Sequence, residues 1–281
     1  MKLTVVTATF NCIRGGNGAK LQRCIESVSS LKCEHEHLIM DGASIDGTAE
    51  LARRVGSEHN MNELHIFSEK DGGIYEALNK GLARAKGEWF YVLGSDDYIS
   101  HPEVLDSLIV DVDSAVEMVV SPVEQDGREK YSYQAVRDLK KLMMFICYCH
   151  QGVLMRTSML RKMNGFDERF RICADGCLFL RCHTSGVRIE YRKKPFANFA
   201  AGGMCESDHS RYLQENRKML EIGLGISDSE VKHLESTWCI PMRIITKYLL
   251  SSDAGIRIAS WFMLWMRLRH CVKRVLRLGV V

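Results

Sequence analysis

Apolar positions in the first 100 residues follow two alternating patterns. Short, mostly apolar runs of four or five residues are typical of buried strands, and segments with apolar residues every three or four positions are typical of helices with one buried face. The runs predict strands at residues 3–7, 37–40, 64–67 and 89–93. The helical spacing predicts helices at residues 21–31, 48–55 and 74–85. This alternation indicates βαβ units, and hence a parallel sheet with right-handed crossovers.

The same reading extends the fold beyond residue 100. It predicts strands at residues 118–121, 152–155 and 187–191 and a helix at residues 172–183. With only four prolines, and without a low-complexity linker or internal repeat, the chain shows no boundary between two domains. We therefore expect residues 1–240 to form one α/β domain, Rossmann-like, with a mostly parallel central sheet and helices on both faces.

Charge separates the last part of the chain from the rest. The 281 residues carry 38 Lys/Arg and 35 Asp/Glu, with an ordinary globular share of 46% apolar residues. Eight Lys/Arg and one acid fall in residues 241–281, so the preceding 240 residues hold 30 against 34. A body with this acidic excess is not expected to bind nucleic acid.

The basic tail is amphipathic between residues 256 and 278, with apolar side chains on one side and arginines and lysines on the other. Its longest uncharged run, residues 258–266, is too short to span a bilayer, which takes about 20 residues. Our hypothesis is a helix lying on an anionic membrane, with Trp261 and Trp265 in the interfacial zone. The alternative is a helix packed on its own domain or on a second subunit of a homo-oligomer. Eleven cysteines without a signal peptide suggest a reducing, cytoplasmic location at the inner face of the membrane.

Acids follow the predicted strands at the edge where open α/β sheets bind ligands. Asp96 and Asp97 come directly after residues 89–93, and adjacent carboxylates repel each other unless a cation such as a divalent metal compensates them. Asp41 ends the second strand, where a carboxylate can meet a ribose or base edge, and Asp71 lies just past the third. One cleft could therefore hold a nucleotide, a metal and a base. Ordinary solvated turns are the alternative for each acid.

Other polar residues have a structural reading beside the functional one. Asn79 and Lys80 lie on a helix entered through two glycines, which would let an anion approach, or they form a solvated helix face. Asp175 near the start of an apolar helix could complement the helix dipole, or it could be a general base with a raised pKa. His150 and Gln151 could line the same cleft, although a lone histidine is often structural.

In order and spacing, these motifs resemble those of family 2 glycosyltransferases with the GT-A fold, in particular bacterial enzymes that build capsule, exopolysaccharide or lipopolysaccharide. The likeness covers roughly residues 3–205. The motifs that carry it are Val5-Val6-Thr7-Ala-Thr9-Phe-Asn11, Asp41-Gly-Ala-Ser44-x-Asp46-Gly-Thr, Asp71-Gly-Gly-Ile-Tyr-x-Ala-x-Asn79-Lys80-Gly81, Gly94-Ser-Asp96-Asp97, His150-Gln151, Ala174-Asp175 and Gly202-Gly203.

The resemblance implies a role for each matching residue. Asp175 would be the catalytic base, and Asp96 and Asp97 would hold Mn²⁺ or Mg²⁺ on the donor diphosphate, with Gly94 where the family's metal motif has its first Asp. His150 and Gln151 would line the acceptor side. The donor-binding residues would be Thr7, Asn11, Asp41, Ser44, Asp71, Asn79, Lys80, Ser95 and Asp96.

The expected reaction is a metal-dependent, inverting transfer from a nucleotide-sugar, with UDP-sugar favoured, to a glycan or lipid-linked acceptor. Residues 1–240 would be the GT-A catalytic domain, with residues 1–100 as the nucleotide-binding half and residues 101–240 as the acceptor half, followed by the helical tail at 241–281. One rival is an NAD(P)-type Rossmann oxidoreductase using Gly16 and Gly18, although Leu21 stands at its third glycine. The other is a non-catalytic sugar-nucleotide binding module.

Overall fold

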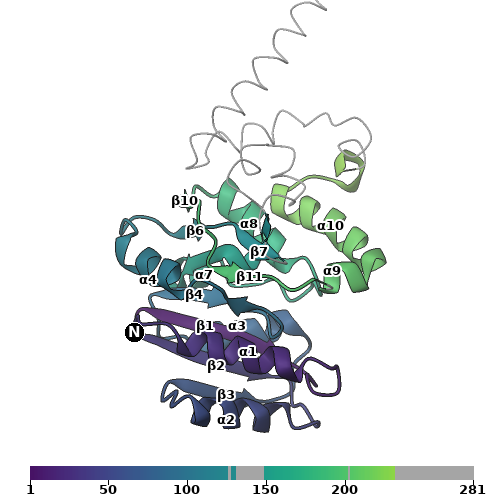
Figure 1. Ribbon diagram of the computed structural model, residues 1–281. Coiled ribbons are helices and arrows are strands. Elements are labelled where there is room, and N and C mark those ends of the chain that lie inside the picture. Colours follow the sequence, from purple (N-terminus) through teal and green to yellow (C-terminus); the bar gives the residue numbers. More distant parts are fainter. Residues whose placement is uncertain (126–127, 131–148, 202, 232–281) are drawn as a thin grey trace, which may run out of the picture.

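The first hundred residues form a regular alternation of strands and helices (Figure 1). The computed structural model describes residues 1–125, 128–130, 149–201 and 203–231. All seven predicted elements of this region are present, with boundaries that differ from the predicted ones by at most three residues. They are β1 (Leu3–Thr9), α1 (Gly18–Ser29), β2 (His35–Asp41), α2 (Thr48–Glu58), β3 (Leu64–Ser68), α3 (Ile74–Arg84) and β4 (Trp89–Val92).

The second half contains the predicted elements and several that the pattern did not indicate. The predicted ones are β6 (Met118–Val120), β9 (Val153–Arg156), α8 (Ala174–Thr184) and β10 (Ile189–Tyr191). The additional ones are β5 (Tyr98–Ile99), α4 (Pro102–Asp111), β7 (Val123–Gln125), β8 (Arg128–Lys130), the 3-10 helix η1 (His150–Gly152), α7 (Thr157–Lys162), β11 (Ala197–Asn198), α9 (Met204–Ser207) and α10 (His209–Leu224).

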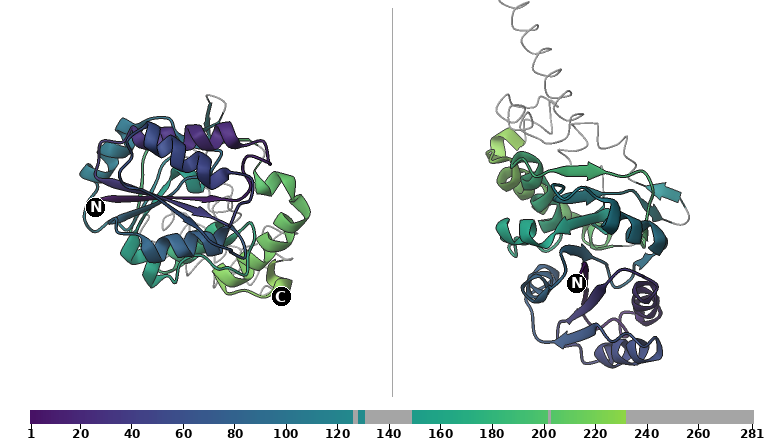
Figure 2. Two further views of the ribbon diagram at one scale, coloured as in Figure 1. Left: turned by 90° about the horizontal axis from the view of Figure 1, so that it is seen from below. Right: turned by 90° about the vertical axis from the view of Figure 1, so that its left-hand side faces the viewer.

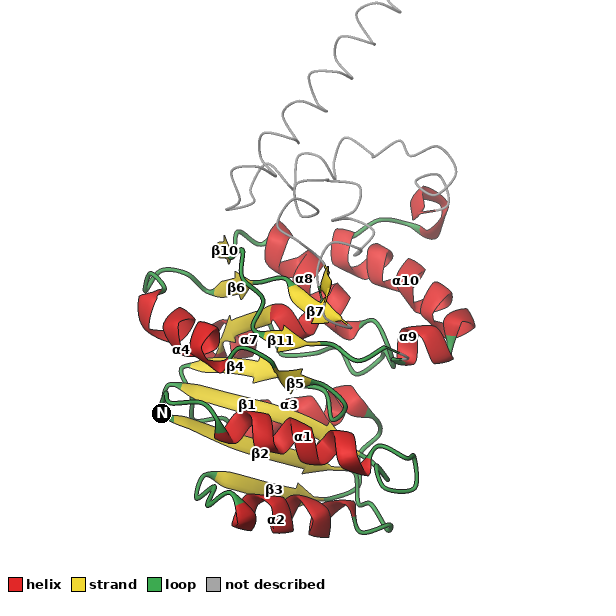
Figure 3. Cartoon of the chain, in the orientation of Figure 1, coloured by secondary structure: helices red, strands yellow, loops and turns green. Residues whose placement is uncertain are grey.

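One seven-stranded sheet runs through both halves in the order β10-β6-β9-β4-β1-β2-β3. Neighbouring strands are parallel except at β9, which pairs antiparallel with both β4 and β6. The sheet is therefore mostly parallel, as expected from the sequence. A second sheet of four short strands, in the order β5-β11-β7-β8, lies beside it (Figure 3).

Helices cover both faces of the large sheet (Figure 2). Helices α1 and α4 share a core with Trp89 and Tyr91, whereas α3, α7, α8 and α10 share the core on the opposite face with Phe90 and Val92. The side chains of β4 thus alternate between two apolar layers, and all four are buried. This confirms the prediction that the run at residues 89–93 is a strand buried on both faces.

Within the described residues, no helix has both the length and the apolar character required to cross a membrane. The tail at residues 241–281 lies outside the described part of the chain. Its amphipathic character therefore stays a prediction from the sequence.

Candidate active site

Asp41 holds together the carboxyl ends of β1, β2 and β3. Its side chain is only 1% exposed. One carboxylate oxygen accepts hydrogen bonds from Ser44 Oγ at 2.5 Å and Thr9 Oγ1 at 3.1 Å, and the other accepts from Ser68 Oγ at 2.6 Å and the Ser44 amide at 3.0 Å. Such a set of donors satisfies a buried carboxylate. Asp41 therefore builds the floor of this edge of the sheet.

Asn11 and Ser44 join the loop after β1 to the loop after β2. The Asn11 amide donates to Ser44 Oγ at 2.8 Å, and its Oδ1 accepts from the Ile45 amide at 3.1 Å. Asn11 adopts a left-handed conformation with φ 47°, which asparagine tolerates better than most residues. The two predicted donor-binding residues thus share one rigid loop pair at the edge that also carries Asp41.

Phe10 is a feature of this edge that the sequence reading did not select. Its side chain is 66% exposed, although an aromatic ring usually packs inward. The neighbouring Gly42 permits a close approach, since a Cβ there would lie 3.2 Å from the Phe10 ring and 2.9 Å from Asp71 Oδ2. The available signal was an aromatic residue between polar Thr9 and Asn11 directly after a strand.

Thr7 does not reach this edge. It is fully buried, and its hydroxyl lies 3.0 Å from His37 Nε2 and 3.8 Å from Cys24 Sγ. Burial, followed by the charge of His35, lowers the pKa of His37 to about 3, so the ring is neutral and pairs with a neutral hydroxyl. Thr7 therefore belongs to the core beneath α1, and we do not place it among residues that a nucleoside could touch.

Asp71 and Lys80 belong to the loop that enters α3. Asp71 Oδ1 accepts from the Gly73 amide at 3.0 Å. Burial raises the pKa of Asp71, and the Gly73 amide and the charge of Lys80 offset this only in part. The Lys80 ammonium itself bonds to Glu76 Oε1 at 3.0 Å and the Lys70 carbonyl at 2.7 Å. Lys80 thus holds the loop through the Lys70 carbonyl, and Asp71 lies beside Gly42.

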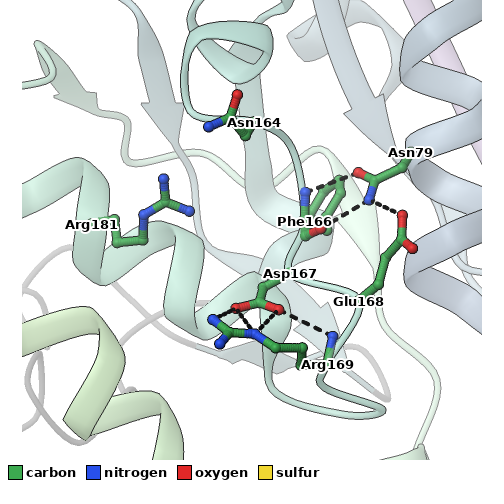
Figure 4. A pocket seen from close by; sticks show the side chains of 7 residues that line it. All are labelled: Asn79, Asn164, Phe166, Asp167, Glu168, Arg169 and Arg181. Carbon is green, nitrogen blue, oxygen red and sulfur yellow. Dashed lines mark hydrogen bonds and ion pairs between the residues drawn. The ribbon is translucent and has the colours of Figure 1, made fainter.

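Asn79 lines a polar pocket of about 520 Å³, and neither Asp96 nor Asp97 is among the residues that line it (Figure 4). Its amide nitrogen donates to the Phe166 carbonyl at 2.8 Å and Glu168 Oε1 at 2.7 Å, and its Oδ1 accepts from the Phe166 amide at 2.9 Å. Asn79 therefore connects α3 to the loop before α8 through these hydrogen bonds. The residues lining the pocket are Asn79, Asn164, Phe166, Asp167, Glu168, Arg169 and Arg181.

The two adjacent aspartates after β4 differ in their surroundings. Asp97 is 2% exposed and accepts from Gln151 Nε2 at 2.5 Å and the Ala200 amide at 2.8 Å. Burial raises the pKa of Asp97 and the neighbouring charge of Asp96 adds to the rise, although its hydrogen bonds oppose it. The Asp96 carboxylate is partly exposed and makes no hydrogen bond to the described residues. Asp96 is thus the member of the pair that is free to bind a ligand.

The loop between β4 and the acidic pair is tightly packed. A Cβ on Gly94 would clash with Asp97 Oδ2, so the acid found in the family's metal motif does not fit here without moving Asp97.

Ser95 contacts Cys12 in the loop after β1. Burial raises the pKa of the Cys12 thiol, while hydrogen bonds involving the Phe10 backbone and the Ser95 side chain oppose the rise. Ser95 therefore lies against the loop after β1.

Asp175 lies in the first turn of α8 with polar partners around its carboxylate. His150 Nδ1 is 3.3 Å from Asp175 Oδ2, while the Tyr75 hydroxyl at 3.1 Å and the Gly176 amide at 2.8 Å face Oδ1. Burial alone would raise the pKa of Asp175, but the hydrogen bond and charge of His150, with the other donors, lower it. The expectation of a raised pKa was wrong. The residues next to Asp175 in the sequence are mostly apolar, but the fold places the side chain of His150 beside its carboxylate.

His150 and Gln151 join this carboxylate to the acidic pair. Burial would lower the pKa of His150, but Asp175, then the charges of Asp97 and Asp96, raise it. The next residue, Gln151, donates to Asp97. Two consecutive residues of η1 thus contact Asp175 and Asp97 and join the loop after β4 to the first turn of α8.

A divalent metal fits the donor set of this site. The described residues contain no group of three or more His, Cys, Asp or Glu side chains that could hold a metal by themselves. Mg²⁺ and similar ions are commonly held by one or two carboxylates together with substrate phosphates. Free Asp96, backed by Asp97, offers that kind of partial ligand set.

Comparison with known proteins identifies a family. The family model for "Glycosyl transferase family 2" matches residues 4–183. A PGL/p-HBAD biosynthesis glycosyltransferase of Mycobacterium bovis BCG is 26% identical over 175 residues, which cover 61% of this chain and 67% of that protein. An uncharacterized glycosyltransferase of Mycobacterium tuberculosis is 28% identical over 191 residues, covering 64% and 68%.

Solved structures show the same GT-A fold at low sequence identity. TarS 1–349 of Staphylococcus aureus, crystallised with UDP, has a TM-score of 0.62 and 15% identity, covering 100% of this chain and 92% of that one. A mannosyltransferase of Pyrobaculum calidifontis, crystallised with GDP-Man and Mn²⁺, has a TM-score of 0.59 and 16% identity, covering 94% and 87%. The predicted α/β architecture is therefore confirmed as GT-A.

Proposed function

Because the chain belongs to glycosyl transferase family 2, and is thus a glycosyltransferase, we propose that it moves a sugar from a UDP-sugar to a hydroxyl of a glycan or lipid-linked acceptor, with inversion at the anomeric carbon. The observation that carries this proposal is the link through η1, in which His150 contacts Asp175 and Gln151 contacts Asp97. A donor diphosphate at the acidic pair would then hold its sugar beside a carboxylate.

The edge formed by the loops after β1, β2 and β3 would bind the nucleoside. Asp41 orients Ser44 and Ser68, and Asn11 is fixed against Ser44. The exposed Phe10 ring offers a face on which a base could stack, and Asp71 Oδ2 lies close by. The UDP in the TarS structure and the UDP in a complex of glucosyl-3-phosphoglycerate synthase from Mycobacterium tuberculosis support a uridine nucleotide as donor.

Asp96 would bind the divalent cation, Mn²⁺ or Mg²⁺, and Asp97 would keep Asp96 and Gln151 in place. When bound, such a cation stabilises the negative charge of the leaving nucleoside diphosphate. The Mn²⁺ in the mannosyltransferase complex supports a metal of this kind.

Asp175 would act as the general base. As the acceptor oxygen attacks the anomeric carbon, its proton passes to the Asp175 carboxylate and the bond from the sugar to the diphosphate breaks. His150 favours the carboxylate form, so the base is ready to accept a proton at neutral pH. A single displacement of this kind inverts the anomeric configuration and requires no covalent nucleophile.

Replacing the base tests the proposal. In Asp175→Asn, transfer from UDP-sugar should fall by about 10²- to 10⁴-fold, the range typical of a general base, while UDP binding in calorimetry should be kept. Asp111→Asn, an exposed position at the end of α4, is the matched control and should transfer normally. Transfer retained in Asp175→Asn would refute the base assignment. Binding without turnover in the wild type would instead support the sugar-nucleotide binding module.

One further measurement would identify the donor. Thermal shifts with UDP-, GDP- and dTDP-sugars in the presence of Mn²⁺ would identify the nucleotide, with UDP expected to give the largest shift. A lipid-linked acceptor would suit an enzyme attached peripherally to the inner face of the cytoplasmic membrane through residues 256–278. Such a location would place it in the synthesis of a bacterial surface polysaccharide.

A further inference from the structure

The segment that carries Asp175 is held by a buried acid from another helix. Glu215 of α10 is 9% exposed. Its carboxylate accepts from the backbone amides of Arg171 at 2.9 Å, Ile172 at 2.7 Å and Cys173 at 3.1 Å. These three amides precede α8 and so have no partner in its hydrogen-bond ladder; one carboxylate from α10 satisfies all three. Glu215 thereby fixes the backbone that leads into the base.

Tyr75 of α3 contacts the same segment. Its hydroxyl donates to the Ile172 carbonyl at 2.5 Å and lies 3.1 Å from Asp175 Oδ1. The hydroxyl lies within donor distance of both oxygens, so its single proton can serve either the Ile172 carbonyl or the Asp175 carboxylate. Burial, with the charge of Asp175, raises the pKa of Tyr75, which keeps the phenol neutral. Tyr75 thus remains a hydrogen-bond donor to the Asp175 carboxylate, and this hydrogen bond helps to lower the pKa of Asp175.

The segment also packs against the loop expected to bind the donor. Gly73, two residues before Tyr75, has φ 144°, and a Cβ there would lie 3.0 Å from Arg171 Nη1. The donor loop, Tyr75 and the base segment are consequently in direct contact. A shift in any of them would move the base relative to the donor.

We propose that Tyr75 and Glu215 are positioning residues for Asp175: they bond to the Ile172 carbonyl and to the amides of residues 171–173, so that the base stays fixed against the donor loop. The inference rests on the proposed function, since it assigns these residues to the base of that reaction. From the sequence, Tyr75 was included only as a member of the motif after Asp71, without a role, and Glu215 was not selected. Neither residue needs to touch substrate.

The test compares Tyr75→Phe and Glu215→Gln with the wild-type full chain. In both variants kcat should fall by about 10- to 100-fold, since a displacement of about 1 Å can cost that much, while the affinity for UDP with Mn²⁺ stays within about twofold. In Tyr75→Phe the acid limb of the kcat profile should also move to higher pH, because the carboxylate loses a hydroxyl that contacts it. In Glu215→Gln, hydrogen exchange of the amides of residues 171–173 should accelerate.

Glu221→Gln is the matched control, because Glu221 lies on the same helix and its side chain makes no hydrogen bond to the described residues. It should behave as wild type. Unchanged exchange at residues 171–173 in Glu215→Gln, or kcat within twofold of wild type in a folded Tyr75→Phe, would overturn the inference while leaving the proposed function intact. A wild-type protein without transferase activity would overturn both.

Discussion

At the scale of the residue, four carboxylates at one edge of the sheet differ in how many donors surround them. Asp41 accepts four hydrogen bonds and Asp97 two, and both are almost completely buried. Asp96 accepts none from the described residues, and Asp175 faces a histidine and a tyrosine. Saturated carboxylates hold structure, whereas unsaturated ones are available for chemistry. The same residue type can therefore serve structure at some positions and remain available for chemistry at others.

The acidic pair should separate into one ligand and one structural residue. Asp97→Asn places an amide that donates hydrogen bonds against Gln151 Nε2 or the Ala200 amide, which are themselves donors, and this should cost about 1–3 kcal/mol and lower the Tm by about 3–10 °C. Asp96→Asn should leave the Tm within about 1 °C of wild type, because no described group is lost, but should weaken Mn²⁺ binding at least tenfold. Calorimetric Mn²⁺ titration in the presence of UDP and a thermal melt measure both effects. Equal behaviour of the two variants would contradict the assignment.

The Asp175–His150 pair predicts a pH effect with a defined sign. His150 lowers the pKa of Asp175, so His150→Gln should raise it, and the acid limb of kcat/KM should move to higher pH. A profile that does not move would show that His150 does not tune the base.

The same pair should contribute to stability over a limited pH range. The depressed pKa of Asp175 gives stabilisation that is present above its unfolded pKa, about 4, and is lost as pH falls through the folded value. The raised pKa of His150 gives stabilisation present below its unfolded pKa, about 6.5, and lost as pH rises through the folded value. The Tm difference between wild type and His150→Gln should therefore be largest between about pH 4 and 6.5.

At the scale of the element, close contact between α3 and the sheet depends on a glycine within the helix. A Cβ on Gly81 would lie 2.7 Å from Val6 Cγ1 on β1 and 3.4 Å from Met40 Cγ on β2. Alanine is the better helix former by about 1 kcal/mol, but overpacking a tight core typically costs about 1–3 kcal/mol. The position of α3, and with it the positions of Tyr75 and of the loop before α3, thus depends on the absence of a Cβ at Gly81.

Gly81→Ala should lower the Tm by about 2–8 °C, since the loss from overpacking exceeds the gain in helix propensity. Gly18→Ala is the control, because the nearest atom to a Cβ there is Ile13 Cγ1 at 3.6 Å, an ordinary contact. Its Tm should be unchanged or slightly higher. Differential scanning calorimetry of both variants checks the prediction, and a stabilised Gly81→Ala would show that the helix can move away from β1.

Elements with a clear apolar period could be predicted from the sequence, and elements defined by long-range pairing could not. The aromatic run of β4 and the stripe of α1 determine their own structure through burial. Strands β5 and β11 contain two residues each and exist because they pair with each other across nearly 100 positions. Helix α10 is mostly polar along its outer face, so its few buried apolar residues gave a weak signal. Glu215 lies on α10, so there was no reason to select it from the sequence once this helix had not been predicted.

At the scale of the whole molecule, the site lies where the direction of strand order reverses. From β1 the chain continues to β2 and β3 on one side, and β4 then pairs with β1 on the other side. Open α/β sheets usually bind ligands at such a reversal, here between β1 and β4. The sequence could therefore indicate the acids after β2 and β4, together with Asp175, as candidates for one site. It could not indicate that Thr7 faces the core, or that Asn79 faces a different pocket. Such orientations depend on which neighbours fold against each side chain.

The basic tail gives the last prediction, because its charge differs from that of the catalytic domain. Each Lys or Arg close to an anionic membrane contributes about 1 kcal/mol of attraction, and residues 241–281 hold eight of them against one acid. The full chain should therefore float with vesicles containing phosphatidylserine, and a variant truncated after Pro241 should not. Raising the salt concentration to 0.5 M should weaken flotation, because exposed charges are screened.

The double variant Arg267→Glu with Arg274→Glu keeps the full length of the chain and should also lose binding to the vesicles. Flotation of a folded truncated variant would place the membrane contact in the catalytic domain. A full chain that never floats but sediments as a dimer only with its tail would assign residues 256–278 to a second subunit instead.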